Sequence, residues 1–526
     1  MAQRRNRGRQ RPSSRLWRVS VFSPSIFINI SPFARTTKIS QGPAPPAPPR
    51  MTSLDNETST AHAEPTLAGT EGLPPGARPT TAAGHPAMVV YSWRDSVTDA
   101  VGWIAIEADD RLPPVGGGGL FVSATTTEAE VVDVARSMAR KLRVTCAAGA
   151  VRGAKGGVRY DPAAPDVNDV IGRFMAANAA VIRTAWATGA DLNTDHHVLD
   201  ALARAHVGVP HCLYALASRY PEARPAHLLG VGTPEAHQGA TSWPRFDVAE
   251  AVVGYGVARA LREITPDDSL DGLDVAVQGF GTVGGTFALY AQALGARVVA
   301  VADRDHFVVR PDGIDVHALL VCRQQRAPSG SALLADCFAP PSSSSPTAPV
   351  SDEGGLVARE PDESNDAWLS RFLDACGGGI DVFAPCAQRY VMTTTTTEAL
   401  AAAIARRRAT VGTGRRAYVA SGANNIAADP SALESFLDAR DVWMVPEWVS
   451  NAGTACLFME ATTRTPPASP NYEVVVGAVG DRVAAFVALA KSRAAVAHAD
   501  NRGAVRPSGL LAACHAVADD ALASCP

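Results

Sequence analysis

The fold is decided by one stretch, V-A-V-Q-G-F-G-T-V-G-G-T-F-A-L-Y-A-Q-A-L-G-A-R-V-V-A-V-A-D-R-D, which runs from Val275 to Asp305. An apolar run leads into the pattern Gly279-x-Gly281-x-x-Gly284, an amphipathic segment follows, and a second apolar run ends before Asp303. This order predicts a strand, a tight turn, a helix and a second strand, with the turn and the helix N-terminus open to a pyrophosphate. The stretch therefore predicts a dinucleotide-binding βαβ unit.

The residues of this unit also indicate which dinucleotide binds. Asp303 stands where a carboxylate would accept hydrogen bonds from an adenosine ribose, which favours NAD. Arg304 beside it could accommodate a 2′-phosphate, so NADP stays open. The turn residues predicted to contact the cofactor are Gly279, Phe280, Gly281, Thr282, Val283 and Gly284.

The alternation of strand and helix continues after Asp305. Apolar runs at 379–383, 417–421 and 442–445 are separated by helical patterns at 397–408 and 430–440. Together with the runs at 274–278 and 298–302 they predict a doubly wound, parallel Rossmann sheet of five strands. The segment 327–366 contains P-P-S-S-S-S-P and is predicted to be a disordered insertion.

With 526 residues the chain is too long for a single core, so several domains are expected. We predict an α/β substrate domain over 88–246, the nucleotide-binding domain over 247–465, and C-terminal helices over 466–526. Residues 1–87 are expected to form a disordered basic N-terminus and linker. In the substrate domain, strands are expected near 88 and at 102–107, and helices at 128–141, 167–188 and 195–206.

The N-terminus is rich in arginine and serine, and no acidic residue precedes Asp55. Such a segment over residues 1–50 is typical of a mitochondrial or plastid transit peptide, although a basic arm for nucleic acid and an extension without function are alternatives. Without targeting the protein would be cytoplasmic. The net charge of −4 gives no global affinity for nucleic acid, and the absence of eighteen consecutive apolar residues argues against a membrane span.

The cysteine and histidine patterns predict no metal site. The nine cysteines include no C-x-x-C pair, which argues against a zinc site and a disulfide scaffold and suggests a reducing compartment. His196 and His197 are adjacent and cannot share one helix face, and no H-E-x-x-H motif exists.

Upstream of the nucleotide unit, three charged residues form a second constellation. Lys155 is flanked by Gly153, Gly156 and Gly157, and such small neighbours would let a substrate approach its amine; a desolvated lysine there can act as a base. Lys141 could supply a fixed positive charge for a carboxylate, and Asp191 could pass protons. Taken alone, a solvated turn and a helix cap explain these residues as well.

From Met88 to Glu460 the chain resembles the glutamate/leucine/phenylalanine/valine dehydrogenase family. G-A-K-G-G-V-R-Y-D-P at 153–162 resembles its catalytic-lysine motif, and Thr188–Asp195 is similar to the segment that carries its catalytic aspartate. The resemblance thus implies catalytic roles for Lys155 and Asp191. Met138-x-x-Lys141 is similar to the element whose lysine holds the substrate α-carboxylate. Because two extra residues separate Lys141 from Lys155, Arg143 is an alternative for that role.

Two further motifs are similar to family elements around the nicotinamide. They are S-G-A-N-N at 421–425 and V-P-E-W-V-S-N-A-G at 445–453. The resemblance implies cofactor contacts for Ala423, Asn424 and Asn451, with Asn451 also beside the substrate. It implies oxidative deamination of an L-amino acid to a 2-oxo acid and ammonia with NAD or NADP, and a homo-oligomeric assembly.

Departures from the family pattern concern the substrate. The usual K-G-G-x-R motif is replaced by P-P-V-G-G-G-G-L-F-V at 113–122, and a small polar position is replaced by Phe458. Both changes remove partners for a second carboxylate, whose unpaired burial would cost several kcal/mol. An apolar amino acid and the leucine and phenylalanine branch are therefore expected; a glutamate dehydrogenase with a modified pocket is the alternative.

Other departures concern activity itself. Leu120 and Phe121 stand where the family has an arginine after its glycine pair, and Val253 replaces a threonine that contacts the cofactor amide. A catalytically weak, nucleotide-binding regulatory protein is therefore a further alternative.

Overall fold

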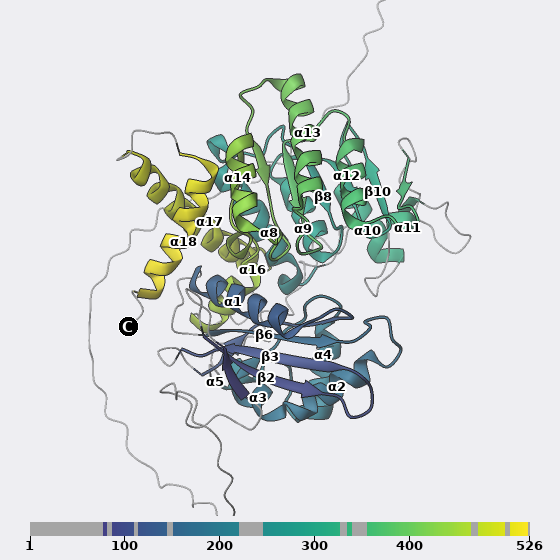
Figure 1. Cartoon of the computed structure of the whole chain (residues 1–526), viewed down its shortest axis with the longest axis vertical. Helices are drawn as coiled ribbons and strands as arrows, with labels where there is room; N and C mark the ends of the chain where they lie inside the picture. The colour runs from purple at the N-terminus through teal and green to yellow at the C-terminus, as the bar shows by residue number, and fades with distance from the viewer. Residues whose placement is uncertain are drawn as a thin grey trace, which may run out of the picture. The chain divides into compact units, whose positions relative to one another are not determined.

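The computed structural model describes residues 77–80, 87–109, 114–144, 151–219, 246–326, 334–338, 355–463, 472–499 and 505–523 (Figure 1). The predicted transit peptide at 1–50 and most of the predicted linker lie outside these residues. Two seven-stranded sheets organise the part of the chain that is described.

The first sheet has the order β1-β2-β3-β6-β4-β7, with β5 also paired to β6. Its strands are β1 (Ala77–Thr80), β2 (Met88–Arg94), β3 (Val101–Glu107), β4 (Gly116–Gly117), β5 (Leu120–Ser123), β6 (Arg152–Arg159) and β7 (Trp186–Ala187). The strands β1, β2, β3 and β6 pair in antiparallel fashion, whereas β4 and β5 run parallel to β6. The strand β6 therefore lies inside the sheet.

Side chains alternate between the two faces of this sheet. Ala105 of β3 packs in one cluster with Val131 of α1 (Glu128–Val144), whereas its neighbour Ile104 packs in another with Phe174 of α2 (Val167–Ala177). The expected helix at 167–188 is interrupted at Asn178, where α3 (Ala179–Thr184) begins, and the chain then enters β7. Three further elements follow β7: helix α4 (His196–Leu202), a π-helical turn (Ala203–Val207) and helix α5 (Tyr214–Arg219).

The second sheet has the order β11-β10-β9-β8-β12-β13-β14. Its strands are β8 (Asp274–Gln278), β9 (Arg297–Ala302), β10 (His306–Val309), β11 (Val357–Ala358), β12 (Val382–Pro385), β13 (Ala417–Val419) and β14 (Val442–Met444). The five predicted strands are present and parallel, as in a doubly wound fold. The antiparallel strands β10 and β11 at one edge were not predicted.

Both faces of the second sheet are covered by helices, which is why its strands read as continuous apolar runs. Val275 and Val277 pack in one cluster with residues of α8 (Val248–Ile264) and α9 (Thr282–Ala293), whereas Ala276 between them packs in a second cluster. That second cluster draws on α12 (Asn365–Ala375), α13 (Thr394–Val411) and α14 (Pro430–Arg440). Figure 1 shows these three helices along the same side of the sheet.

The expected insertion at 327–366 contains regular structure in its described parts. Helix α11 (Leu334–Phe338) follows α10 (Val316–Arg326) and buries Leu334 and Cys337, and β11 pairs with β10. The expectation of disorder over the whole segment is thus too broad, because its two ends hold apolar residues that pack against the sheet edge. Its serine-rich centre lies outside the described residues.

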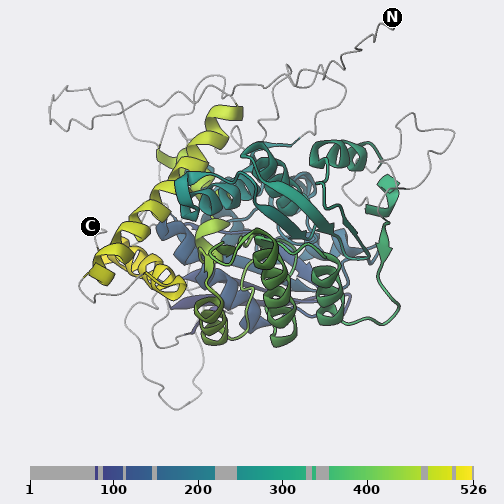
Figure 2. The ribbon, with the colours of Figure 1, turned by 90° about the horizontal axis from the view of Figure 1, so that it is seen from above.

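The C-terminal part is helical. The short helix α15 (Glu447–Ser450) and α16 (Gly453–Thr463) precede α17 (Tyr472–Ala499) and α18 (Pro507–Ala523), which lie side by side (Figure 2). Lys491 of α17 reaches Glu263 at the end of α8, with its Nζ 3.3 Å from the carboxylate. Among the described helices, none is long and apolar enough to cross a membrane.

A buried ion network joins the amino ends of the parallel strands. Asp381, just before β12, is 1% exposed and accepts hydrogen bonds from Arg407 Nε at 2.9 Å and Arg415 Nε at 3.0 Å. It also accepts the backbone N–H of Asp274 at 2.9 Å, and Asp274 in turn pairs with Arg297 at 2.6 Å. The network lies at the end of β8 opposite the glycine turn, so its role is structural.

Candidate active site

The glycine turn connects β8 to α9. Gly279 has a φ of +90°, a conformation that favours glycine, and its N–H donates to Ala302 O at 2.8 Å. A Cβ on Gly284 would lie 1.7 Å from the carbonyl oxygen of Gly279, so only glycine fits there. Gly281 is exposed, and a Cβ on it would meet nothing within 4 Å. The N-terminus of α9 is therefore open to a ligand.

The side chains of the turn have different surroundings: some are buried in the core, and others contact a loop of the second sheet or lie exposed. Phe280 is buried, with the Arg323 guanidinium 5.6 Å from its ring centroid, and Thr282 is exposed. A Cβ on Gly422 would lie 2.6 Å from Val283 Cγ1. The loop S-G-A-N-N at 421–425 thus packs directly against the start of α9.

The carboxylate of Asp303 already holds backbone groups. Its Oδ1 accepts the N–H groups of Asp305 at 2.9 Å and His306 at 2.7 Å, and its Oδ2 accepts Leu334 N–H at 2.6 Å. Arg304 is 75% exposed and pairs with Asp305 at 3.0 Å. These hydrogen bonds hold the turn between β9 and β10. A hydrogen bond from a ribose to Asp303 would be made in addition to them.

Lys155 and Asp191 form an ion pair in the first sheet. Lys155 is 4% exposed and lies on β6, and Asp191 follows β7, one residue after a bridge between Ala190 and Leu120. The N–H of Leu192 donates to the carboxylate of Asp191 at 2.7 Å. Burial alone would raise the pKa of Asp191, but the Lys155 ammonium and the hydrogen bonds outweigh it and hold that pKa below its usual value.

The glycines around Lys155 serve packing between protein groups. A Cβ on Gly153 would lie 2.4 Å from the backbone of Ala139 in α1, and one on Gly156 would lie 2.3 Å from the Trp186 ring. A Cβ on Gly157 would lie 2.5 Å from Val131. The expectation that these glycines leave room for a substrate is therefore wrong; they let α1 and β7 approach β6, and this close packing fixes the position of Lys155.

Residues from the two sheets meet at Lys141. Lys141 of α1 is buried, and its Nζ donates to Asn424 Oδ1 at 2.6 Å. Asn451 Nδ2 donates to the same oxygen at 3.1 Å and to the carbonyls of Gly422 and Ala423. The structure thus brings Lys141, Asn424 and Asn451 into one hydrogen-bonded group, and Lys155 and Asp191 lie close enough to influence the charge of Lys141.

The pKa of Lys141 is lowered to about 7, mainly by burial and then by the charge of Lys155. If its ammonium binds the substrate carboxylate, kcat/KM for the 2-oxo acid should fall as pH rises through about 7. Arginine stays charged, so Lys141→Arg should shift this alkaline limb upward. The measurement is kcat/KM for the 2-oxo acid against pH at saturating ammonium and reduced cofactor. An alkaline limb unchanged in Lys141→Arg would rule out this role.

The pocket expected for the substrate side chain is apolar. Gly117 belongs to the four-glycine run at 116–119. A Cβ on Gly117 would lie 3.0 Å from Val151 Cγ1 and 3.9 Å from Phe458 Cδ2. Phe458 of α16 is buried. Gly117 and Phe458 are thus close together, although 341 residues separate them in the sequence.

Arg389 was not expected at the site. Its guanidinium lies 4.8 Å from the ring centroid of Phe121, one of the two residues in place of a family arginine, and it pairs with Glu130 of α1. Arg389 follows β12 and lies close enough to Asp191 and Lys141 to influence their pKa values. Sequence gives no signal for this contact, because 259 residues separate Arg389 from Glu130.

Two other predicted residues lie apart from this contact. Arg143 belongs to α1, but its side chain lies outside what the structure describes. Val253 is partly buried in α8.

Residues 247–465 match the sequence profile of the glutamate/leucine/phenylalanine/valine dehydrogenases. The chain is also 26% identical over 358 residues to the NADP(+)-dependent glutamate dehydrogenase of Pyrobaculum calidifontis, across 66% of this chain and 69% of that protein. Over these residues the chain is similar to this family. The dehydrogenase is accordingly an NAD(P)-dependent oxidoreductase that acts on the CH–NH2 group of its donor.

Other relatives agree with this assignment. The NAD-specific glutamate dehydrogenase A of Halobacterium salinarum is 29% identical over 187 residues, which cover 36% of the dehydrogenase and 32% of that protein. These relatives are glutamate dehydrogenases, so the expected place in the leucine and phenylalanine branch gains no support from them.

Solved structures share the fold. The hetero-hexameric glutamate dehydrogenase of Thermus thermophilus, in a leucine-bound form, matches with a TM-score of 0.54 and 20% identity, over 82% of the dehydrogenase and 88% of that chain. Glutamate dehydrogenase from Plasmodium falciparum matches with a TM-score of 0.57 and 15% identity, over 83% of each chain. The two-sheet α/β architecture of the dehydrogenase is therefore that of glutamate dehydrogenases.

Proposed function

We propose that the dehydrogenase interconverts L-glutamate and 2-oxoglutarate with release or uptake of ammonia. The observation that carries the reaction type is the ion pair of buried Lys155 with partly buried Asp191, next to the Lys141–Asn424–Asn451 group. Glutamate is chosen over other amino acids because the relatives named above are glutamate dehydrogenases.

Each charged residue has one task in this scheme. Lys141 binds the α-carboxylate of the substrate through its ammonium. Lys155, as the neutral amine, takes a proton from the water that attacks the imine carbon. Asp191 accepts a proton from Lys155 and passes protons to the departing amine. Bound NAD(P)+ supplies the acceptor for the hydride that leaves the α-carbon.

The chain's own residues fit a nicotinamide dinucleotide. Asn451 Oδ1 is buried without a hydrogen-bond partner, and such an acceptor suits the amide N–H of a nicotinamide. At the other end, Gly281 and the N-terminus of α9 suit the pyrophosphate. We propose NAD as the main cofactor because Asp303 directly follows β9, and NADP as a second because Arg304 beside it is exposed and could accommodate a 2′-phosphate.

An apolar amino acid is the second candidate substrate. Gly117, Val151 and Phe458 bring no cation to the expected side-chain pocket, and an unpaired buried carboxylate is unfavourable. Initial rates with glutamate, leucine, valine, norvaline and phenylalanine separate the two proposals. Preference for glutamate supports the first and preference for norvaline or leucine the second. Tight cofactor binding without turnover of any of them would instead indicate a regulatory protein.

A designed cation should strengthen glutamate use. In Gly117→Lys combined with Phe458→Ser, the new ammonium can pair with the γ-carboxylate, and a charge-assisted hydrogen bond contributes about 1.5–3 kcal/mol. We expect kcat/KM for glutamate relative to norvaline to rise by about 10- to 100-fold. Phe458→Ser alone is the matched control. An unchanged ratio in the double variant would mean that the side chain of the substrate lies elsewhere.

The dehydrogenase is also proposed to form a homo-oligomer. Support comes from the related Thermus thermophilus enzyme, which is described as a hetero-hexamer. Light scattering on the purified full chain measures its mass directly, and a monomer would refute the proposal.

A further inference from the structure

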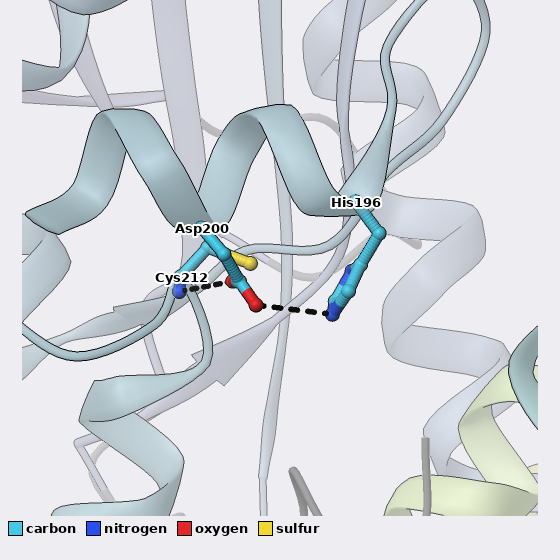
Figure 3. A group of neighbouring side chains, drawn as sticks. All are labelled: His196, Asp200 and Cys212. Carbon is cyan, nitrogen blue, oxygen red and sulfur yellow. Dashed lines mark hydrogen bonds and ion pairs between the residues drawn. The ribbon is translucent and has the colours of Figure 1, made fainter. Parts of the chain in front are cut away.

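Three metal-ligating side chains lie together outside the candidate active site. They are His196 and Asp200 of α4 and Cys212 in the turn before α5 (Figure 3). One possible ligand atom from each lies within 4.8 Å of the other two. His196 Nε2 is 3.9 Å from Asp200 Oδ2, and Figure 3 shows imidazole and carboxylate turned toward each other.

The backbone holds these side chains in place. His196 and Asp200 are four residues apart, so they share one face of α4, and the carboxylate of Asp195 caps that helix by accepting His197 N–H at 2.9 Å. Cys212 N–H donates to Asp200 Oδ1 at 2.9 Å, which leaves Oδ2 on the side of His196. Cys212 is fully buried, whereas the side chain of His196 is 32% exposed, so an ion could enter from that side.

His211, the residue before Cys212, has an unsatisfied ring nitrogen. Its Nδ1 is buried without a hydrogen-bond partner, although buried imidazole nitrogens are usually satisfied. His211 precedes Cys212 in the chain and lies close enough to Asp200 and His196 for both to influence its charge. His211 is not one of the three side chains whose ligand atoms lie within 4.8 Å of one another, so its imidazole would have to move toward them to become a fourth ligand.

We propose that His196, Asp200 and Cys212 bind a zinc ion, with His211 or water as the fourth ligand. Mixed sulfur, nitrogen and oxygen ligands in a tetrahedral arrangement are typical of Zn2+. Zinc ligands lie about 2.0–2.3 Å from the ion, which sets them roughly 3.5 Å apart, so these atoms need to approach by about 1 Å. On binding, the Cys212 thiol releases its proton to solvent as the zinc–sulfur bond forms.

The zinc ion would brace the segment that carries Asp191. The carbonyl of Cys212 accepts Thr188 N–H at 3.2 Å, three residues before Asp191, and His196 lies five residues after it. A metal that joins Cys212 to α4 therefore links the segments on both sides of Asp191 and restricts the movement of that residue. This role rests on the proposed function, but metal binding itself does not. Sequence spacing gives no signal for the site, because Cys212 lies twelve residues after Asp200 and meets it only where the chain turns back.

The test uses the full chain after removal of metal with a chelator. Calorimetry with Zn2+ should show one tight equivalent that Cys212→Ser weakens by more than about 100-fold, beyond the effect of losing an outer-shell partner. Co2+ in place of Zn2+ should give a thiolate-to-cobalt charge-transfer band and the visible bands of a tetrahedral site. Both signals should be lost in Cys212→Ser and reduced in His196→Ala, and Zn2+ should raise the thermal midpoint of the wild type but not that of Cys212→Ser.

Matched controls distinguish this site from the other thiols. His197→Ala removes the exposed neighbour of His196, and Cys514→Ser removes a buried cysteine in α18; both should keep the equivalent and the cobalt spectrum. Circular dichroism measures whether each variant is folded. If Cys212→Ser does not fold, His196→Ala tests the site on its own. Absence of a tight equivalent in the wild type, or a cobalt–thiolate band that is undiminished in a folded His196→Ala or persists in Cys212→Ser, would overturn the proposal. Because neither signal depends on turnover, failure here would leave the dehydrogenase assignment intact.

Discussion

Replacing Lys155 with methionine is expected to lower kcat/KM for the amino acid by about 10³-fold, within the range for loss of a general base. Methionine preserves the length of the side chain in a tightly packed strand but cannot take a proton. Because the glycine turn and Asn451 are untouched, cofactor affinity should stay within a few-fold of the wild type. Initial rates of reduced-nicotinamide formation and calorimetry with the cofactor measure the two quantities separately.

The controls for Lys155→Met use other residues of the same chain. Lys491→Met, on α17 and half-exposed, should keep wild-type rates. Asp191→Asn should also be slow, and the double variant should be about as slow as Lys155→Met alone, because residues that act as a unit are not additive. A decrease below about 10-fold in a folded Lys155→Met protein would contradict a general-base role.

The second large effect concerns stability. Asp381→Asn should lower the free energy of unfolding by about 3 kcal/mol, because the buried charge that pairs with Arg407 and Arg415 is removed and both arginines remain. Chemical denaturation measures this change. Since Asp381 lies at the end of the second sheet opposite the glycine turn, the kcat of the folded fraction should not change.

Asp374→Asn is the matched control. Asp374 is 61% exposed and pairs with Arg406 at 3.5 Å, so its loss should change stability by less than about 1 kcal/mol. If Asp381→Asn left stability unchanged, or lowered kcat without destabilising the chain, the structural role of the network would be wrong.

In the second sheet, the strands that are buried on both faces could be predicted from the sequence. Runs such as Val275–Val277 and Val298–Ala302 are apolar throughout because helices cover both sides, and the glycine turn fixes the connection between them. The edge strands escaped prediction for a physical reason. His306–Val309 returns antiparallel after a short turn that Asp303 organises, and Val357–Ala358 is too short to show any period.

The candidate site shows a similar limit. Lys155, Asp191 and Lys141 stood out through motifs, and the structure brings them close together. Contacts that depend on tertiary approach were invisible in the sequence. Arg389 reaches Phe121 and Glu130 across the two sheets, and Asp200 meets Cys212 only because the chain turns back after α4. Motif spacing encodes neither contact.

The central claim is that the Lys155–Asp191 pair makes this chain a working amino acid dehydrogenase. One measurement tests it most directly: the initial rate of reduced-nicotinamide formation by the purified full chain and its Lys155→Met variant, with NAD+ or NADP+ and glutamate or the apolar amino acids. We predict amino-acid-dependent turnover, fastest with glutamate, that falls by about 10³-fold in Lys155→Met. Cofactor binding without turnover of any of these substrates, or equal rates in the two proteins, would contradict the claim.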